Sequence, residues 1–220
     1  MIVRRSCAVA ALLALALTAT ACARGAPDYQ SIWSTTPTTT SAAPTATEKP
    51  EPFPQYLESL GVLGEAVVPS TLKDLSVTLP RPAGWQKYSN ANIAPQTEMI
   101  AKKDTYPTAM LMVFRLHGGF DVAEAIKHAT ADALLSPGFT KLNESFADFS
   151  GFPSAMIEGS YDGANGKRLH TYNRVVIPVT SAPVFQRYLV QLTVTSLADA
   201  AVADADAIQA IIDGFQVTAR

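Results

Sequence analysis

The chain has 220 residues, of which 48% are hydrophobic and 16% are charged, with 17 basic and 19 acidic side chains. This composition is that of an ordinary globular protein, and the length suits one domain or two small ones. A weakly acidic chain offers no general basic surface, which argues against nucleic-acid binding.

Residues 1–21 have the order of an export signal. Arg4 and Arg5 precede an unbroken apolar run from Ala8 to Leu17, and small residues follow at positions 19–21. Such a short apolar run cannot cross a bilayer as a stable helix. We therefore predict a lipoprotein signal peptide over residues 1–21.

Cys22 follows this segment directly, and its position decides between release and anchoring. Thr20 and Ala21 match the two small residues of the bacterial lipobox, whose cysteine receives a diacylglyceryl group, whereas Ala19 stands where Leu or Val is usual. The alternative is a cysteine that happens to lie beside an ordinary cleavage site. Exported proteins seldom keep a lone thiol, and Cys7 would be discarded with the signal. We predict lipidation of Cys22 and a lipid-anchored location on the extracytoplasmic face of the cell membrane, with release or surface exposure as alternatives.

Residues 22–54 form the next unit. Between Ser34 and Pro50, every residue except Glu48 and Lys49 is Ser, Thr, Pro or Ala. Such a segment buries too little to offset the entropy of ordering, so we predict a disordered tether that begins with the lipidated cysteine. In a polyproline-like conformation it reaches on the order of 100 Å. Thr35–Thr40 are predicted O-glycosylation acceptors, and an unmodified spacer is the alternative.

A folded domain is predicted over residues 55–220. Residues 54–64 suit a short helix, and the alternation of residues 75–79 indicates a strand. Trp85 follows a turn, where it either caps the core or stacks on a ligand; the core position is favoured. Residues 98–102 and 109–116 are further strands. The second is nearly all apolar and is expected to be a central strand covered on both faces.

The middle of the domain predicts a helix and a hairpin. One continuous helix is expected over residues 121–135, because Asp121 and Glu124 form a capping box before an apolar face. Strands over residues 156–161 and 168–177 flank the pair Asn165-Gly166, which tolerates the positive φ of a tight hairpin turn.

The last part of the chain predicts one more strand and one more helix. Residues 185–195 alternate between apolar and polar, so one face of that strand should be buried and the other polar. Ser196 and Asp199 repeat the capping pattern and open a helix that Gly214 ends. Together these elements describe an α+β domain with an antiparallel sheet and helices packed on it.

Several motifs in combination carry a family resemblance. They are the lipobox-like Cys22, the Thr/Pro tether, VTLPRPAGW from Val77, GFDVAEAI from Gly119, DGANGKRLHTYNRVVIP from Asp162 and YLVQLTVTSLADAA from Tyr188. Over essentially its whole length the chain resembles the LpqN/LpqT family of mycobacterial lipoproteins, and LpqT more than LpqN. The resemblance implies a Mog1/PsbP-like fold, in which helices sandwich an antiparallel sheet, and an actinobacterial cell-envelope location. It implies no catalytic site.

The titratable and nucleophilic residues predict no enzyme, metal site or cofactor. His117, His128 and His170 lie in no zinc-binding motif, and the sequence has no G-x-S-x-G elbow and no spare thiol. The segment before Arg168 matches a phosphate loop only in part, because Tyr161 stands where glycine is required. An envelope hydrolase with a dispersed site, built from His170 and a carboxylate, is the alternative.

The candidate ligand-binding residues lie on two neighbouring strands and are Arg168, His170, Tyr172, Arg174 and Arg187. The first four alternate onto one strand face. Guanidinium groups beside tyrosine and histidine suit an anionic or sugar-bearing ligand. The alternative is a solvated sheet face on which these basic groups pair with carboxylates such as Glu158 and Asp162.

We therefore predict a non-enzymatic envelope protein. Its expected partners are the membrane, through the lipid anchor, and an envelope lipid, glycolipid or protein. Acylated bacterial lipopeptides are sensed by innate immune receptors, so a host receptor is a further expected partner of the lipidated N-terminus. A purely structural assembly factor without a small ligand is the remaining alternative, because inference from fold to function is analogy.

Overall fold

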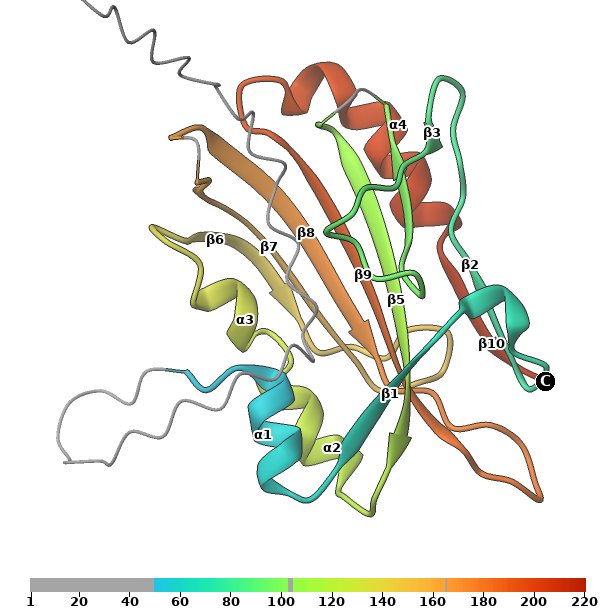
Figure 1. The fold of residues 1–220 in the computed structure, drawn as a ribbon. Helices are drawn as coiled ribbons and strands as arrows, with labels where there is room; N and C mark the ends of the chain where they lie inside the picture. The colour runs from blue at the N-terminus through green and yellow to red at the C-terminus, as the bar shows by residue number, and fades with distance from the viewer. Residues whose placement is uncertain (1–49, 103–104, 165) are drawn as a thin grey trace, which may run out of the picture.

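One large antiparallel sheet organises the part of the chain that the structure, a computed structural model, describes: residues 50–102, 105–164 and 166–220 (Figure 1). The predicted signal peptide, Cys22 and the tether as far as residue 49 lie outside these residues. In chain order the elements are α1 (Phe53–Ser59), β1 (Leu63–Val67), η1 (Pro69–Thr71), β2 (Leu75–Thr78), β3 (Gln86–Lys87), β4 (Glu98–Ala101), β5 (Thr108–His117), α2 (Val122–Ala125), η2 (Ile126–His128), α3 (Ala131–Leu134), β6 (Thr140–Ser145), β7 (Ser154–Asp162), β8 (Arg168–Val176), β9 (Arg187–Leu197), α4 (Ala201–Gly214) and β10 (Gln216–Ala219).

The large sheet has the strand order β3-β4-β5-β9-β8-β7-β6. β9 takes one edge of β5, while β4 and β1 share the other edge, one after the other along it. A second, two-stranded sheet joins β2 to β10. β5 is buried without interruption from Thr108 to Phe114. The predicted central strand covered on both faces is therefore confirmed.

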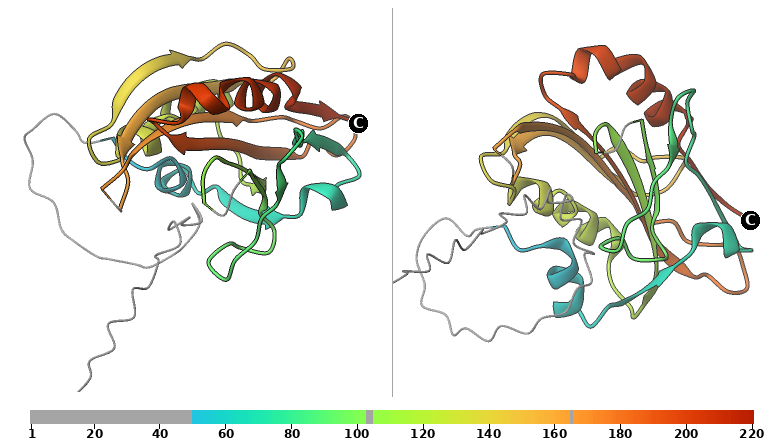
Figure 2. Two further views of the ribbon diagram at one scale, coloured as in Figure 1. Left: turned by 90° about the horizontal axis from the view of Figure 1, so that it is seen from above. Right: turned by 45° about the horizontal axis from the view of Figure 1, so that its top comes forward.

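Helices lie on both faces of the sheet (Figure 2), and each face carries a hydrophobic core. On one face, α4 and the β2–β10 pair contribute to an apolar cluster that includes Leu111 and Ile211. On the other face, α1, α2 and η2 contribute to a second cluster that includes Leu57 and Leu189. Alternate residues of β5 and β9 enter the two clusters, as the two-residue period of a strand requires. The predicted α+β fold, with helices on both faces of an antiparallel sheet, is confirmed.

The helix predicted over residues 121–135 is instead divided into α2, η2 and α3. Its start is as predicted, because the Asp121 carboxylate accepts hydrogen bonds from two backbone N–H groups of α2 at 2.9 and 3.2 Å. Ala125, Ala129 and Ala131 are all buried. A continuous α-helix that buried the first two would place Ala131 on its outer side, so the tighter 3₁₀ turn of η2 reorients the chain.

The last helix begins later than predicted. β9 continues to Leu197, and Ser196 is 1% exposed opposite His170 of β8, so it caps no helix. α4 starts after Ala200, which offers no side-chain cap. The capping pattern predicted at Ser196 and Asp199 is therefore wrong, because pairing with β8 extends the strand beyond what local sequence preference indicates.

The sequence pattern indicates none of β1, β3, β6 and β10. The helix predicted over residues 54–64 ends at Ser59, and Gly61 (φ +75°) turns the chain into β1. β6 has no buried residue, so it shows no apolar alternation. β1 and β10 are held by β5 and β2, which lie far away in the sequence.

Other predicted features are confirmed. β7 and β8 form the hairpin, with Gly166 at φ +72°. Trp85 is 4% exposed in the core, as favoured. β9 begins at Arg187, two residues later than predicted. Its supposedly polar face carries the buried Leu189, because helices cover that side of the sheet as well.

Candidate functional site

Arg168, the first residue of the predicted ligand site, is held by neighbouring strands. Its guanidinium forms an ion pair with Asp162 at 2.7 Å, and it donates to Thr140 Oγ1 at 2.8 Å and to the Ser160 carbonyl at 3.0 Å. These partners lie on β6 and β7. They already occupy much of the hydrogen-bonding capacity of this side chain.

The next residues along the same strand face are also partnered within the protein. His170 Nε2 lies 3.0 Å from Glu158 Oε1 on β7. Arg174 donates from Nε to the Tyr172 hydroxyl at 2.7 Å, and its guanidinium lies 4.6 Å from the centre of the Phe149 ring. Tyr172 is only 6% exposed and belongs to the core. Arg168 and His170 thus pair with Asp162 and Glu158, the carboxylates named in the alternative of a solvated sheet face.

Arg187 lies on the opposite face of the sheet from the other four. It pairs with Leu116 of β5, and both Leu116 and Leu189, two residues along β9, belong to the cluster beneath α1 and α2. Its guanidinium lies 5.5 Å from the centre of the Phe120 ring on that side. Strand parity therefore separates Arg187 from the site to which the sequence assigned it.

The hydrolase alternative requires a nucleophile beside the histidine–carboxylate pair of His170. Its histidine–carboxylate pair with Glu158 exists, and Ser196 lies directly across from His170 on β9. However, the Ser196 hydroxyl is buried and forms no hydrogen bond within the described part of the chain. A serine nucleophile needs a hydrogen bond to its base and access to substrate, and Ser196 has neither here.

A small polar cleft, the sheet cleft, opens between α3 and strands β7 to β9. It has a volume of about 180 Å³, and its lining includes Asp132, Tyr161, Asn173, Gln191 and Thr193. Thr193 donates to the Asn173 side-chain oxygen at 2.6 Å. Burial raises the pKa of Asp132 to about 6, although a hydrogen bond from the Phe53 backbone opposes the shift. The sheet cleft thus contains a carboxyl group that titrates near neutrality.

Replacing Asp132 with asparagine is expected to stabilise the protein at pH 7. The carboxyl pKa is 3.8 in an ordinary setting and about 6 in the folded chain, so the folded state binds this proton more tightly and stability falls as the pH rises from 4 to 6. Asparagine removes the charge but keeps an acceptor for Phe53. The free energy of unfolding should therefore rise by about 2 to 3 kcal/mol at pH 7.

Urea unfolding of wild type and the Asp132→Asn variant at pH 7 and pH 4 measures this difference, which should nearly vanish at pH 4. Asp199→Asn, at an exposed position, is the matched control and should change stability by less than about 0.5 kcal/mol. An equal gain in both variants, or a gain that persists at pH 4, would contradict a buried Asp132 carboxylate as its source.

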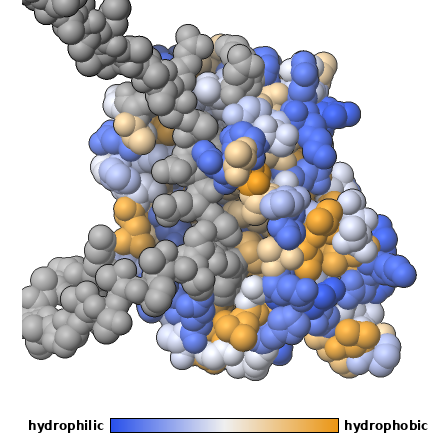
Figure 3. All heavy atoms as spheres, in the orientation of Figure 1, coloured by the Kyte–Doolittle hydropathy of each residue, from blue (hydrophilic) through white to orange (hydrophobic). Residues whose placement is uncertain are grey.

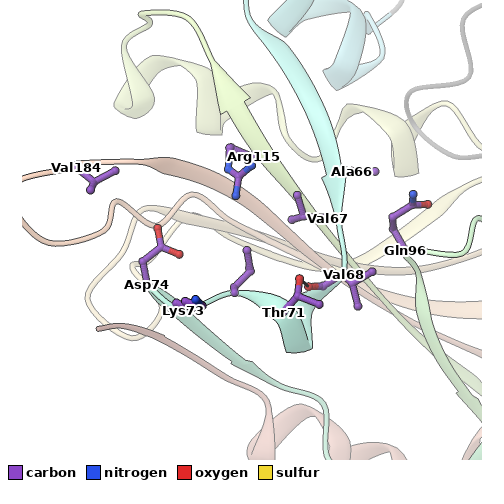
Figure 4. Close-up of a pocket in the computed structure, with 10 residues that line it drawn as sticks. Ala66, Val67, Val68, Thr71, Lys73, Asp74, Gln96, Arg115 and Val184 are labelled. Atoms are coloured by element: carbon purple, nitrogen blue, oxygen red, sulfur yellow. Dashed lines mark hydrogen bonds between the residues drawn. The ribbon is translucent and has the colours of Figure 1, made fainter.

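A hollow larger than the sheet cleft lies beside β1 and is here called the β1 groove (Figure 4). Its volume is about 670 Å³. Its lining comes from β1, η1, β5 and the connections β1–η1, η1–β2, β3–β4 and β8–β9. It consists of Ala66, Val67, Val68, Thr71, Leu72, Lys73, Asp74, Gln96, Arg115 and Val184. Apolar side chains therefore line the same hollow as basic side chains, such as Lys73, and the acidic Asp74.

The polar side of the β1 groove is organised around Arg115. Arg115 donates to Glu65 at 3.1 Å, and its guanidinium lies 5.9 Å from the centre of the Tyr188 ring. The Tyr188 hydroxyl donates to the Asp74 carboxylate at 3.1 Å. Hydrogen bonds from His117 and Arg115 lower the pKa of Glu65. Lys73 forms no ion pair within the described residues, so its ammonium group is available to a ligand.

Sequence reasoning missed the β1 groove. Three of its lining residues, Ala66, Val67 and Val68, lie on or beside a strand that the sequence pattern does not indicate. Arg115 sits in the run that predicts a buried central strand, and only its register opposite Glu65 reveals that it points to a surface hollow. A signal that could have been used is the interruption of that apolar run by one charged residue.

No helix among the described residues combines the length and apolar character needed to cross a membrane. No group of three or more histidine, cysteine, aspartate or glutamate side chains in the same residues is arranged to hold a metal ion.

Comparisons with known proteins agree with the sequence resemblance. A family model described as "Probable lipoprotein LpqN" matches residues 49–218. A Mycobacterium tuberculosis protein named as the lipoprotein LpqT is 59% identical over 99% of this chain and 96% of its own length. The crystal structure of M. tuberculosis LpqN has a TM-score of 0.61 at 22% identity, covering 74% of this chain and 95% of that one. The solution structure of a cyanobacterial PsbP from Synechocystis has a TM-score of 0.41 at 10% identity, covering 67% and 94%.

Proposed function

Because the chain belongs to the LpqN family of lipoproteins, we propose that it is a non-enzymatic, lipid-anchored protein of the cell envelope that binds an envelope glycolipid in the β1 groove. The anchor is the acylated Cys22, on the extracytoplasmic face of the membrane. Its relatives are named as lipoproteins, and the M. tuberculosis LpqN structure is described as that of a protein involved in cell envelope biogenesis.

The β1 groove is the observation that carries the proposed ligand. Val67, Leu72 and Val184 give it apolar walls suited to part of an acyl chain. Gln96 and Lys73 add hydrogen-bond donors beside them, and acceptors are present as well. Its volume falls within the range of small-molecule binding sites. An amphiphile with a hydroxylated headgroup uses both kinds of lining, whereas the five residues predicted from sequence are spread over two sheet faces.

Native mass spectrometry of the protein extracted from membranes, followed by lipid analysis, tests this proposal. Thr71→Trp places a large ring in the β1 groove from an exposed position of η1. We expect the wild type to carry a bound glycolipid and the population of loaded protein to fall several-fold in this variant. The same measurement reports acyl chains on Cys22 and sugar on Thr35–Thr40.

Leu142→Trp is the matched control, because Leu142 is 64% exposed on β6, at the far edge of the sheet. Equal glycolipid loading in both tryptophan variants would contradict binding in the β1 groove. A protein that carries no lipid but a stoichiometric polypeptide would favour the assembly-factor alternative. Turnover of an acyl or glycosyl substrate that disappears in a folded His170→Ala variant would overturn the non-enzymatic assignment.

A further inference from the structure

The connection between β8 and β9 projects from the body of the domain (Figure 1). It contains two exposed large apolar residues. Val184 is 67% exposed and Phe185 is 62% exposed. Apolar spheres gather at the corresponding lower-right corner of the surface view (Figure 3). Burying two such side chains is worth about 1.5 to 3 kcal/mol each. Neighbouring large apolar residues at a projecting tip therefore call for an explanation.

Hydrogen bonds at its base hold this tip in a defined position. Thr180 donates from its backbone N–H to the Gln186 carbonyl at 2.9 Å, and Gln186 donates from its backbone N–H to Thr180 Oγ1 at 3.0 Å. The Gln186 side chain also donates to the Leu116 carbonyl of β5 at 2.9 Å. Phe185 has φ +48°, a left-handed conformation that costs a non-glycine residue about 1 kcal/mol or more. The fold therefore maintains a strained backbone that presents an aromatic ring to solvent.

We propose that Val184 and Phe185 insert into the interfacial region of the bilayer that carries the chain, so that the β1 groove opens toward the membrane surface. This inference rests on the Cys22 anchor of the proposed function. Phe185 supplies the aromatic group favoured at the headgroup boundary. Val184 belongs both to the tip and to the wall of the groove, where Figure 4 places it at one end.

Two observations, together with the proposed anchor, favour a lipid surface rather than a protein as the occupant. The apolar tip projects from the domain (Figure 1), and a projecting apolar point suits a deformable bilayer boundary. Lys73 lines the groove together with Val184 and forms no ion pair within the described residues, so it can meet an anionic headgroup, whereas Arg115 is already paired with Glu65. The proposed tether keeps the domain at high local concentration near the membrane. Val184 and Phe185 therefore need only orient the domain, and they do not have to bind the membrane on their own.

Tryptophan fluorescence quenching tests this arrangement in the mature chain, residues 22–220. Its single thiol, Cys22, is coupled to a maleimide lipid in vesicles of phosphatidylglycerol and phosphatidylethanolamine with brominated acyl chains, which makes the test independent of natural acylation. Trp33→Phe removes the tether fluorophore, and Phe185→Trp places a ring at the tip. We expect quenching at residue 185 to exceed, several-fold, that of Leu142→Trp in the same background.

The single change Phe185→Ser provides the second measurement, because Phe185 lies at the tip but does not line the β1 groove. In the anchored chain with Trp33 intact, it should slow the transfer of a fluorescent glycolipid between vesicles and protein, while the ligand binds normally in detergent. Equal quenching at residues 185 and 142 would overturn the proposal, as would unimpaired transfer in the Phe185→Ser variant. Absence of acyl mass on Cys22 in cells would instead contradict the anchor of the proposed function. The quenching result would still test insertion of the tip, because the vesicle experiment attaches the lipid chemically.

Discussion

A Cys22→Ser variant is expected to move from the membrane fraction to the soluble fraction almost completely. A diacylglyceryl group contributes two acyl chains, and each buried methylene is worth about 0.8 kcal/mol, so the thioether accounts for nearly all of the membrane affinity. The tip residues Val184 and Phe185 add orientation but too little apolar area to hold the domain alone. Cell fractionation followed by immunoblotting measures the distribution.

Cys7→Ser is the matched control, because Cys7 lies within the predicted signal peptide. The Cys7→Ser protein should remain in the membrane fraction. The same pair of variants tests the proposed host receptor. Purified Cys22→Ser protein should stimulate innate immune cells far less than wild type, whereas Cys7→Ser protein should match it. Membrane retention of the Cys22→Ser variant would show that another segment anchors the chain.

A Lys102→Met variant is expected to lose about 3 kcal/mol of folding stability, or roughly 10 °C in midpoint temperature. Lys102 Nζ lies 2.8 Å from Asp204 Oδ1, and the Asp204 side chain on α4 is only 6% exposed. Without the lysine, the buried Asp204 carboxylate has no ion-pair partner among the described residues. Because α4 contributes to the hydrophobic core on one face of the sheet, the loss lowers the folding stability of the whole domain.

Two further variants show whether the lost stability comes from leaving a buried charge unpaired or only from losing a surface ion pair. Lys127→Met breaks the exposed pair with Glu124, whose atoms lie 2.6 Å apart, and should cost less than about 1 kcal/mol. Combining Lys102→Met with Asp204→Leu removes the buried carboxylate together with its partner and should recover most of the loss. Chemical denaturation of the four proteins measures these energies. A double variant no more stable than Lys102→Met would contradict the explanation.

The parts of the fold that were predictable are those in which local pattern and tertiary packing agree. The apolar run of β5, the Asp121 cap and the Gly166 turn follow from residue chemistry at the position concerned. Ser196 illustrates the opposite case. Its spacing from Asp199 suits a cap, but the free edge of β8 offers hydrogen bonds to the backbone over the same residues, and strand pairing prevails.

The candidate site was less predictable, because a pattern within one strand cannot determine relations between strands. Arg168, His170, Tyr172 and Arg174 share a face, which the two-residue period indicates without any structure. Arg187 required the register between β9 and β5, and that register places it on the other face. The β1 groove required still more, since its walls come from segments that no short-range pattern connects.

The β2–β10 pair determines when the groove can be completed during synthesis. Leu75 of β2 lies opposite Ala219 of β10, and the Arg220 backbone N–H donates to the Asp74 carbonyl at 2.9 Å. Asp74 and the neighbouring η1 form a wall of the groove, so this wall gains its strand partner only when residues 216–220 have been made. Every strand of the large sheet precedes β10 in the chain, so this wall of the groove gains its strand partner after those strands have been made.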